Sequence, residues 1–224
     1  MEEKQPSNHR KPAATHKKPK QEVYVLRDMR EYLGESLLII FSVFLALVVT
    51  EYINTLHEKS QTRELMDNIK NELVKNKKLE EAQYTYQKNI LKRIDSAIND
   101  PVLHHKIISG GELHLKYVFS DGHGVLYGDL SDVAWQVAKS QNIFPKINFE
   151  LVEKLTNVYN DQERIGKLED KIGGILLSYE SRNDNNIRQT LILIRDGYKG
   201  WAVDRAPGLI QQYDEAIKAI EAEQ

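Results

Sequence analysis

The sequence has 224 residues, no cysteine and only six prolines. The absence of cysteine excludes a disulfide-stabilised scaffold, a thiolate zinc finger, an iron–sulfur centre and a cysteine nucleophile. The chain also lacks an excess of one charge, because 31 Lys and Arg residues oppose 33 Asp and Glu residues, for a formal net charge of −2. The whole-chain charge therefore offers no argument for nucleic-acid binding.

Motifs of common catalytic and nucleotide-binding sites are missing as well. No Walker-type glycine loop, Gly-x-Gly-x-x-Gly turn, Gly-x-Ser-x-Gly elbow or His-Glu-x-x-His helix occurs. One cluster of zinc-ligand residue types falls within 20 residues: His104, His105, His114, His123 and Asp121. The adjacent His104 and His105 would point in different directions on a helix, so we interpret the cluster as a polar connection. The sequence thus predicts no catalytic residue, no cofactor and no metal site.

The near-neutral net charge conceals an uneven distribution. The first 34 residues carry a formal charge of +3 and the remaining residues −5. The first 20 residues contain no Val, Ile, Leu or aromatic residue, but they contain Pro6, Pro12 and Pro19. Such a segment cannot bury enough apolar surface to offset its chain entropy, which predicts a disordered basic cytoplasmic tail over residues 1–30. We interpret its charge as suited to anionic lipid headgroups rather than to nucleic acid.

One long hydrophobic run, residues 36–50, carries no charge and is closed by Glu35 and Glu51. As a helix its 15 residues would be about 22 Å long, short of a hydrocarbon core of about 30 Å. Extension to Leu33–Ile53 gives 21 residues, which is enough to span. The two carboxylates then lie near the helix ends, where a charge costs much less than at the centre because the side chain reaches the interface.

We interpret residues 31–55 as a transmembrane helix with its flanks, and Tyr32 and Tyr52 stand where interfacial aromatic residues are expected. A cleaved signal peptide is one alternative, but the leader is long and Ala46–Leu47–Val48 is a poor cleavage site. A buried core helix is the other alternative. Against it, no face between residues 37 and 49 is polar, and no comparable apolar run occurs elsewhere.

Basic residues close to the run predict its orientation. Five lie within about 20 residues on the N-terminal side and three on the C-terminal side: Lys17, Lys18, Lys20, Arg27 and Arg30 against Lys59, Arg63 and Lys70. The bias favours a cytoplasmic N-terminus. We expect a single-pass protein of the inner membrane, with the domain after the span in the periplasm of a Gram-negative cell.

Small residues recur along one face of the predicted span. Gly34, Ser42, Ala46 and Thr50 are separated by multiples of four residues. Such a stripe allows two helix backbones to approach closely, and the hydroxyl groups can hydrogen-bond across the contact. We therefore treat these four residues as a possible transmembrane packing face, against the alternative that small residues are simply common in spans.

The segment from Leu56 to Asn99 contains no proline or glycine, and its apolar residues recur at the helical period. This pattern predicts a long charged helix that ends at Asn99–Asp100–Pro101. In a coiled-coil register, four polar residues would enter the core: Glu72, Asn76, Gln83 and Arg93. A helix that shares its apolar stripe with later helices fits better, and the carboxylate pair Glu80–Glu81 is interpreted as solvated surface.

Five of the twelve glycines lie between residues 101 and 130, which predicts an irregular segment near 101–128. Helical periodicity then returns, with Asp129 or Ser131 as the first cap and Asn148 as the next. Short connections between the later helices favour antiparallel neighbours. We predict an all-α fold, with one N-terminal transmembrane helix followed by a long helix and an antiparallel helical bundle within residues 56–224.

Several motifs in a fixed order carry a family resemblance: the Glu-led span over residues 35–47, Glu51–Tyr52, Glu64–Leu65, Ala134–Trp135 and Val158–Tyr159. Together they resemble a broad group of uncharacterised single-pass bacterial membrane proteins with a long charged helix after the span. The resemblance covers roughly residues 31–165 and implies topology rather than chemistry. Where that group usually has Trp after the span, this chain has Tyr52.

These features predict a membrane-anchored protein that acts by interaction or as a scaffold and is not an enzyme. Its expected partners are the lipid bilayer and either another protein or a second copy of the chain, with no nucleic acid. The alternative is an extracytoplasmic sensor or small-ligand-binding module, because a helical bundle can hold a ligand between its helices. A polar cavity lined by Trp135 or Tyr159 would favour that alternative.

Overall fold

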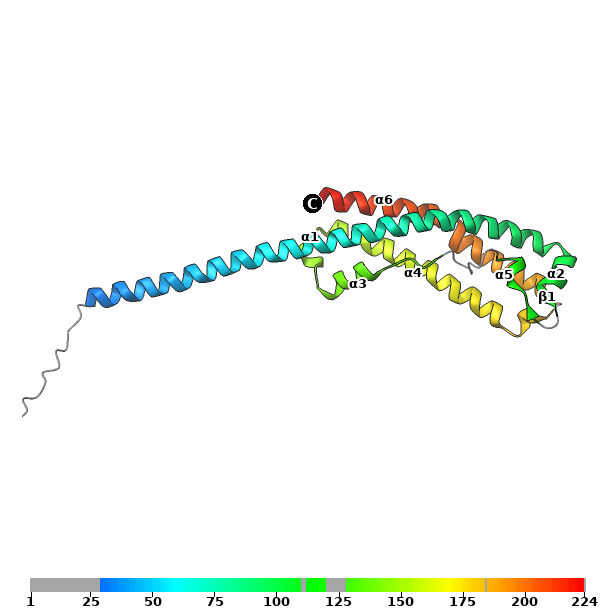
Figure 1. Cartoon of the computed structure of the whole chain (residues 1–224), viewed down its shortest axis with the longest axis horizontal. Helices are drawn as coiled ribbons and strands as arrows, with labels where there is room; N and C mark the ends of the chain where they lie inside the picture. Colours follow the sequence, from blue (N-terminus) through cyan, green and yellow to red (C-terminus); the bar gives the residue numbers. More distant parts are fainter. Residues whose placement is uncertain (1–28, 110–111, 120–127, 184, 224) are drawn as a thin grey trace, which may run out of the picture. The chain divides into compact units, whose positions relative to one another are not determined.

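A computed structural model describes residues 29–109, 112–119, 128–183 and 185–223 of the chain (Figure 1). These residues are predominantly helical, as the all-α prediction requires. The chain divides into two compact units, Met1–Ile53 and Asn54–Gln224, which are described separately. Six α-helices are described: α1 (Met29–Ile98), α2 (Pro101–Ile107), α3 (Val133–Ser140), α4 (Phe149–Leu177), α5 (Ile187–Tyr198) and α6 (Ala206–Glu223).

The first unit contains the beginning of α1, whose large apolar side chains are all exposed between Leu33 and Ile53. Phe41 and Phe44, for example, are each 63% exposed. We call residues 33–53 the apolar segment. In the described part of the chain, α1 is the one helix long and apolar enough to cross a membrane.

In the second unit, α1 buries a narrow seam of side chains. Buried residues recur in alternating steps of three and four: Ile69, Leu73, Asn76, Glu80, Gln83, Gln87, Ile90, Ile94 and Ala97. This spacing keeps one stripe of a helix facing its neighbours. Apolar side chains from α2 to α6 join the apolar members of the seam in one core. The predicted long helix is present, and its partners are the later helices of the same chain.

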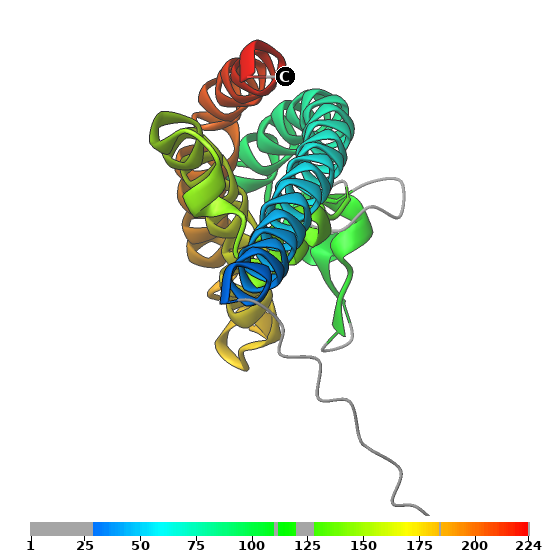
Figure 2. The ribbon, with the colours of Figure 1, turned by 90° about the vertical axis from the view of Figure 1, so that its left-hand side faces the viewer.

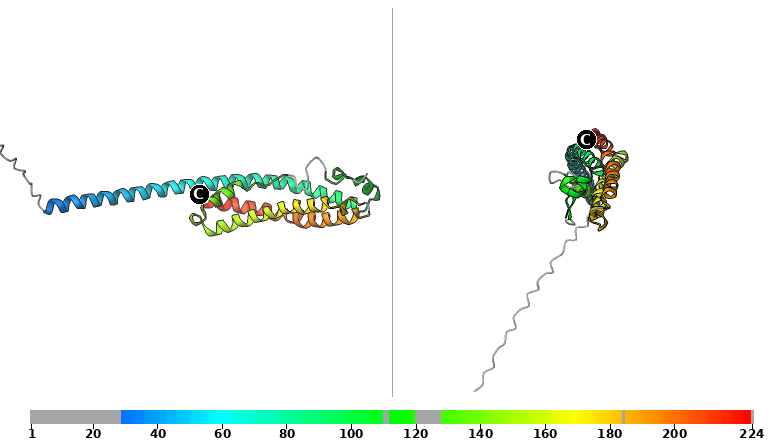
Figure 3. Two further views of the ribbon diagram at one scale, coloured as in Figure 1. Left: turned by 90° about the horizontal axis from the view of Figure 1, so that it is seen from below. Right: turned by 90° about the vertical axis from the view of Figure 1, so that its right-hand side faces the viewer.

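The pairing of side chains defines the helix directions within the second unit, and the ribbons of these helices can be followed in Figure 3. Glu72 and Asn76 of α1 pair with Tyr159 and Gln162 of α4, so both helices advance together and run parallel. Helix α6 runs antiparallel to α1. Lys77 of α1 pairs with Asp214 of α6, and Met66, which is earlier in α1, lines one pocket with Ile220, which is later in α6. Figure 2 shows these helices end-on, side by side.

Helices α1 and α4 run parallel, and the prediction of antiparallel neighbours does not cover this pair, because it concerned later helices joined by short connections. Residues 99–148 connect the two helices, and that long connection lets the chain return to the end where α1 enters the second unit. There, Lys146 forms an ion pair with Glu58 of α1, with Nζ and Oε2 3.0 Å apart. A short connection would have forced an antiparallel pair, and a long one does not.

The segment predicted to be irregular contains regular structure in its described part. Asp100 accepts hydrogen bonds from the backbone N–H groups of Val102 and Leu103, and Pro101 occupies the first turn, so α2 begins there. The strands β1 (Ile108–Ser109) and β2 (Glu112–Leu113) then pair antiparallel, followed by the 3₁₀-helix η1 (Leu115–Tyr117). The sequence signals for α2 are the Asp100 cap and Pro101 in the first turn, whereas the prediction of an irregular segment was based on the glycines.

The later helices follow their sequence signals more closely. Asn148 caps α4 as predicted, accepting the N–H of Glu150 at 2.8 Å. Helix α4 continues through Gly173 and Gly174 to Leu177. The 3₁₀-helix η2 (Phe144–Lys146) precedes it, η3 (Glu180–Arg182) follows it, and the π-helix η4 (Lys199–Val203) joins α5 to α6. Together these elements place Tyr159, Gln162 and Tyr213 against the seam of α1.

Candidate functional site

Four consecutive seam positions of α1 are polar: Asn76, Glu80, Gln83 and Gln87. We call this set the polar seam. Apart from Asn76, which is 3% exposed, its side chains have no solvent-accessible surface. Apolar seam residues lie on both sides, Ile69 and Leu73 before it and Ile90 and Ile94 after it. A buried polar group is costly unless it is hydrogen-bonded, so each side chain of the polar seam needs a physical explanation.

Asn76 is explained by its contacts with the backbone of Ser131. Its Oδ1 accepts the Ser131 N–H at 3.0 Å, and its Nδ2 donates to the Ser131 carbonyl at 2.6 Å. Gln162 Nε2 donates to the same carbonyl at 3.2 Å, and Asn76 Nδ2 also lies 3.2 Å from Gln162 Oε1. The side-chain amide of Asn76 thus satisfies both the backbone N–H and the backbone carbonyl of Ser131, and with Gln162 it holds Ser131 against α1 and α4.

Glu72, one turn before Asn76, completes this anchor. Its carboxylate accepts hydrogen bonds from the Ser131 hydroxyl at 2.8 Å, the Ala134 N–H at 2.9 Å and the Tyr159 hydroxyl at 2.7 Å. The Ala134 N–H belongs to the first turn of α3, where a carboxylate is also favoured by the helix dipole. The prediction that Asp129 or Ser131 caps this helix is incomplete, because the main cap comes from α1 and Ser131 Oγ accepts only the Val133 N–H at 3.5 Å.

Tyr159 links this anchor to an aromatic stack. Its ring lies parallel to that of Trp135, with centroids 4.9 Å apart and an interplanar angle of 6°, and Trp135 packs in turn against Phe144. Burial and the hydrogen bond to Glu72 raise the pKa of the Tyr159 hydroxyl. Both rings are buried, so Trp135 belongs to the core rather than to a binding groove.

The other three side chains of the polar seam have buried polar atoms without hydrogen-bond partners among the described residues. Among the described residues, no hydrogen-bond partner is present for either carboxylate oxygen of Glu80, either amide atom of Gln87, Oε1 of Gln83 or the hydroxyl of Tyr213. Gln83 Nε2 does donate to the Gly128 carbonyl, at 2.7 Å. Burial raises the pKa of Glu80 to about 7, and the nearby Glu80 contributes to a raised pKa of Tyr213, whose largest cause is burial. Groups in this state can bind ordered water or hold a proton.

The sequence contained part of this site, but its interpretation was incomplete. The burial of Glu72, Asn76, Gln83 and Arg93 was the argument against a coiled-coil register, yet the first three are buried and only Arg93 is exposed. The interpretation of Glu80–Glu81 as solvated surface is wrong for Glu80, because it lies on the seam and only Glu81 faces solvent. The alternating three- and four-residue spacing from Ile69 to Ala97 is the signal that would have identified it.

A pocket of about 370 Å³ lies beside the polar seam, at the gap between α4 and the segment before α3. Its polar lining includes Gln83, Tyr159 and Gln162, together with the exposed Asp132 and Lys167. The volume lies within the range of ~300–1,000 Å³ common for ligand sites. No group of three His, Cys, Asp or Glu side chains suited to a metal occurs in the described residues.

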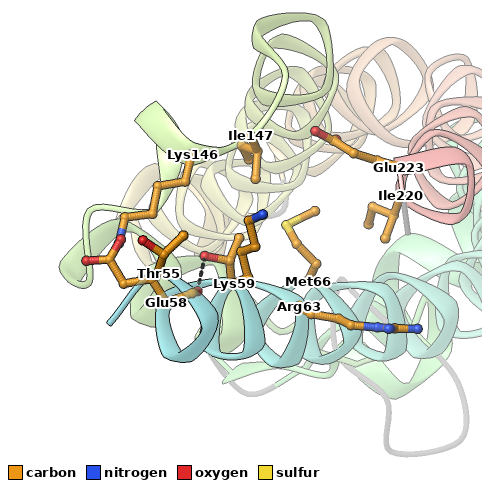
Figure 4. Close-up of a pocket in the computed structure, with 10 residues that line it drawn as sticks. Thr55, Glu58, Lys59, Arg63, Met66, Lys146, Ile147, Ile220 and Glu223 are labelled. Carbon is orange, nitrogen blue, oxygen red and sulfur yellow. Dashed lines mark hydrogen bonds and ion pairs between the residues drawn. The ribbon is translucent and has the colours of Figure 1, made fainter. Parts of the chain in front are cut away.

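A second pocket, of about 540 Å³, lies where α1 enters the second unit (Figure 4). We call it the Lys59 pocket; its lining residues are Thr55, Glu58, Lys59, Thr62, Arg63, Met66, Lys146, Ile147, Ile220 and Glu223. Its apolar floor comes from three elements, α1, α6 and the turn that precedes α4. Figure 4 shows Lys59 directed from α1 toward Ile147 and Met66.

The structure also places the residues singled out from the sequence. Ser42 and Thr50 donate hydrogen bonds from their hydroxyls to the carbonyls four residues earlier, at 2.7 and 2.8 Å, within α1. Gly34 and Ala46 lie on the same helix, and an added Cβ at Gly34 would meet no atom within 4 Å. All four residues of the possible packing face are exposed among the described residues.

The predicted histidine cluster falls partly outside the described residues, which exclude His123 and Asp121. Nε2 of His104 lies 2.7 Å from the carbonyl of Ala97, so this ring joins α2 to the end of α1. His105 also lies on α2, and His114 precedes η1. The structure thus gives His104 a local structural contact.

Comparisons with protein-family models, with curated proteins and with solved structures find no match to this chain. The resemblance to single-pass bacterial membrane proteins therefore stays a prediction.

Proposed function

We propose that the chain is a single-pass membrane-anchored protein whose second unit acts by interaction or as a scaffold, without enzymatic activity. One observation carries the proposal: the apolar segment exposes every large hydrophobic side chain from Leu33 to Ile53. An exposed apolar surface of this extent is unfavourable in water and favourable in hydrocarbon. As a helix, its 21 residues have a length of about 31 Å, which matches a hydrocarbon core.

The helix geometry also supports the proposal. Within α1, the hydroxyls of Ser42 and Thr50 are paired with backbone carbonyls, so they need no water. Internal satisfaction of polar groups is the condition for a helix in lipid. The glutamates at 35 and 51 stand near the ends of the segment, where long side chains reach the interface.

The basic residues near the apolar segment favour an N-terminus in the cytoplasm and a second unit in the periplasm of a Gram-negative cell. In this arrangement the long helix that follows the span packs with α4, which runs parallel to it, and with α6, which runs antiparallel. Gly34, Ser42, Ala46 and Thr50 supply a face through which two copies associate in the membrane. We propose that the second unit binds another protein or a second copy of the chain.

The experiment is fractionation of cells that express the full chain, followed by extraction of membranes with alkaline carbonate. We expect the chain to stay in the membrane pellet, as an integral protein does. A periplasm-active reporter fused after Gln224 should be active, whereas a cytoplasm-active reporter at the same position should not. Release of the chain by carbonate would refute the anchor, and the reverse reporter pattern would refute the orientation.

A second candidate function is a sensor or small-ligand-binding module, and the pocket beside the polar seam favours it. Tyr159 lines this polar pocket, as the alternative required, and Gln83 connects it to unpartnered buried groups. Thermal-shift screening of the full chain in detergent against polar metabolites tests this candidate. A ligand whose stabilisation is lost in Gln83→Leu but kept in Gln61→Leu, an exposed residue of the same helix, would support it.

A further inference from the structure

Glu80 and Tyr213 bring two unsatisfied groups to the contact between α1 and α6. Neither side chain has any solvent-accessible surface. Among the described residues, no hydrogen-bond partner is present for the two carboxylate oxygens of Glu80 or for the hydroxyl of Tyr213. A buried carboxyl group without a partner is far less costly when it is neutral than when it is charged, so this contact favours the protonated form of Glu80.

An ion pair beside these two residues fixes how α1 and α6 face each other. Lys77 lies three residues before Glu80 on α1, and Asp214 directly follows Tyr213 on α6, with Nζ and Oδ1 of the pair 2.7 Å apart. Because the helices are antiparallel, this pair places Glu80 opposite the turn of α6 that contains Tyr213. Burial is the largest cause of the raised pKa of Tyr213, and the charge of Glu80 is the next, as expected for side chains that lie near each other.

The described residues offer Glu80 no free cation. Lys77, one turn earlier on α1, is bound by Asp214, and its Nζ also lies 3.7 Å from Oε1 of Glu81. The seam neighbours of Glu80 on either side are uncharged amides. Burial is therefore what raises the pKa of Glu80 to about 7.

Titratable groups on the other elements around the polar seam are engaged, neutral or at the surface. From α4, Tyr159 and Asp161 are both held by hydrogen bonds. In the segment before α3, Asp129 and Asp132 are exposed. From α5, the buried Tyr198 stays neutral, because burial holds its pKa above the usual value. A charge that forms on Glu80 thus has no counter-charge among the described residues.

The polar contacts of α1 differ in strength on the two sides of Glu80. Before it, Glu72 and Asn76 hold α1 on α4 and on the segment before α3 through short hydrogen bonds. Beside it, the polar contacts with α6 are a partly exposed ion pair, which contributes little free energy, and the two unsatisfied groups. Helix α6 is separately tied to α4, since Gln212 donates a hydrogen bond to Asp161 at 2.9 Å. An ionised Glu80 can therefore reach water between α1 and α6 while these stronger contacts persist.

We propose that the contact of α1 with α6 at Glu80 and Tyr213 is a pH-sensitive latch. With Glu80 neutral, the two helices stay packed. When Glu80 loses its proton, they separate enough for water to hydrate the carboxylate, while α1 stays anchored to α4 through Glu72 and α6 stays tied to α4 through Gln212. The latch lies wholly within the second unit, so it does not depend on the proposed membrane anchor.

Distances between spin labels test the latch, because the chain has no cysteine of its own. Lys78→Cys on α1 and Gln211→Cys on α6 place labels at exposed positions of the two helices. Double electron–electron resonance on the full chain in detergent micelles compares pH 6 with pH 8. A hydrated glutamate has a pKa near 4.5, against about 7 for Glu80 in the packed state, so the ratio of separated to packed chains should rise about tenfold.

Two matched variants and a second label pair control this measurement. Glu80→Gln should abolish the rise, because the amide cannot ionise, and Glu81→Gln at the exposed neighbouring position should retain it. Labels at Asn157→Cys on α4 and Glu215→Cys on α6, both exposed positions, should keep one distance at both pH values. The latch is overturned if the first pair shows one distance at both pH values, if the rise persists in Glu80→Gln or is lost in Glu81→Gln, or if the second pair also separates.

Discussion

Helix α1 contains two regions that reverse the usual relation between polarity and burial. From Leu33 to Ile53 its apolar side chains are exposed, and at Asn76, Glu80, Gln83 and Gln87 its polar side chains are buried. In water each region alone would be unfavourable, the first through exposed apolar surface and the second through desolvated polar groups. The comparison teaches that the two regions differ in what offsets their cost: for the first we propose a hydrocarbon solvent, whereas in the second Asn76 is paired with Ser131 and Glu80 and Gln87 are buried without a described partner.

The largest effect is expected from charges placed in the apolar segment. Phe41→Asp with Leu45→Asp puts two carboxylates near its centre, at a cost of about 5–7 kcal/mol for insertion on translocon-based scales. We expect the variant to leave the membrane pellet or to be degraded. Fractionation followed by immunoblotting measures the result.

Val102→Asp with Leu193→Asp is the control for this variant. These side chains of the second unit are 65% and 51% exposed, close to the 63% of Phe41 and 50% of Leu45. The control should remain in the membrane pellet. If both double variants behave alike, exposure to lipid is not what distinguishes the apolar segment.

The next effect concerns the carboxylate that anchors Ser131, Ala134 and Tyr159. Glu72→Ala leaves three donors without their acceptor, and we expect a loss of about 4 kcal/mol in the free energy of unfolding. Urea denaturation of the full chain in detergent, followed by circular dichroism, measures it. Glu64→Ala, at an exposed position of the same helix, should change stability by less than about 0.5 kcal/mol. Equal losses would contradict the anchor.

A pH-dependent effect follows from Glu80. Its pKa is about 7 in the folded chain, whereas an exposed glutamate loses its proton near 4.5. Between these values the folded chain binds more protons than the unfolded chain, so the free energy of unfolding falls as pH rises from about 4.5 to 7 and stays lower above. The expected loss between pH 4.5 and 8 is about 3 kcal/mol.

Glu80→Gln should remove most of this pH dependence and stabilise the chain at pH 8, because the amide cannot ionise. Glu81→Gln, at the exposed neighbouring position, should leave the slope unchanged. Thermal unfolding of the full chain at pH 5 and pH 8 compares the three proteins. The change in melting temperature from pH 5 to pH 8 in Glu80→Gln is subtracted from that in the native chain. If no fall remains, a buried protonated Glu80 is contradicted.

The smallest effect tests a local signal that the sequence already contained. Asn148→Ala removes the cap of α4 and should cost about 1 kcal/mol of stability. Asn160→Ala, at an exposed position within the same helix, should be neutral or slightly stabilising. Differential scanning calorimetry of both variants in one detergent gives the comparison. A larger loss in Asn160→Ala would show that α4 depends on its middle rather than on its cap.

Local chemistry explains what the sequence could predict. The long helix, its end near Asn99 and the Asn148 cap follow from helical periodicity, proline and capping side chains, which act within a few residues. The burial of Glu80 could have been predicted from the seam spacing, because the stripe from Ile69 to Ala97 contains Glu80 and not Glu81. Local chemistry does not indicate which later elements cover that stripe. Likewise, the capping of α3 by Glu72 joins residues 62 positions apart, and no local pattern contains that information.

The same distinction applies to the candidate sites. The possible packing face of Gly34, Ser42, Ala46 and Thr50 is visible in the sequence because all four residues share one helix. The Lys59 pocket needs α1, α6 and the turn before α4 to meet, and it emerges only from the parallel course of α1 and α4. Long-range topology, set here by the long connection of residues 99–148, therefore determines what the local signals leave open.

The absence of cysteine makes the central claim directly testable, because single cysteines can be introduced without background. Phe44→Cys lies in the apolar segment and Glu64→Cys on the exposed side of α1 in the second unit, and both positions are exposed in the chain itself. In intact spheroplasts, a membrane-impermeant maleimide should label Glu64→Cys rapidly. Phe44→Cys should stay unlabelled until detergent or denaturant is added. Equal labelling of the two cysteines in intact membranes would contradict a membrane-spanning apolar segment.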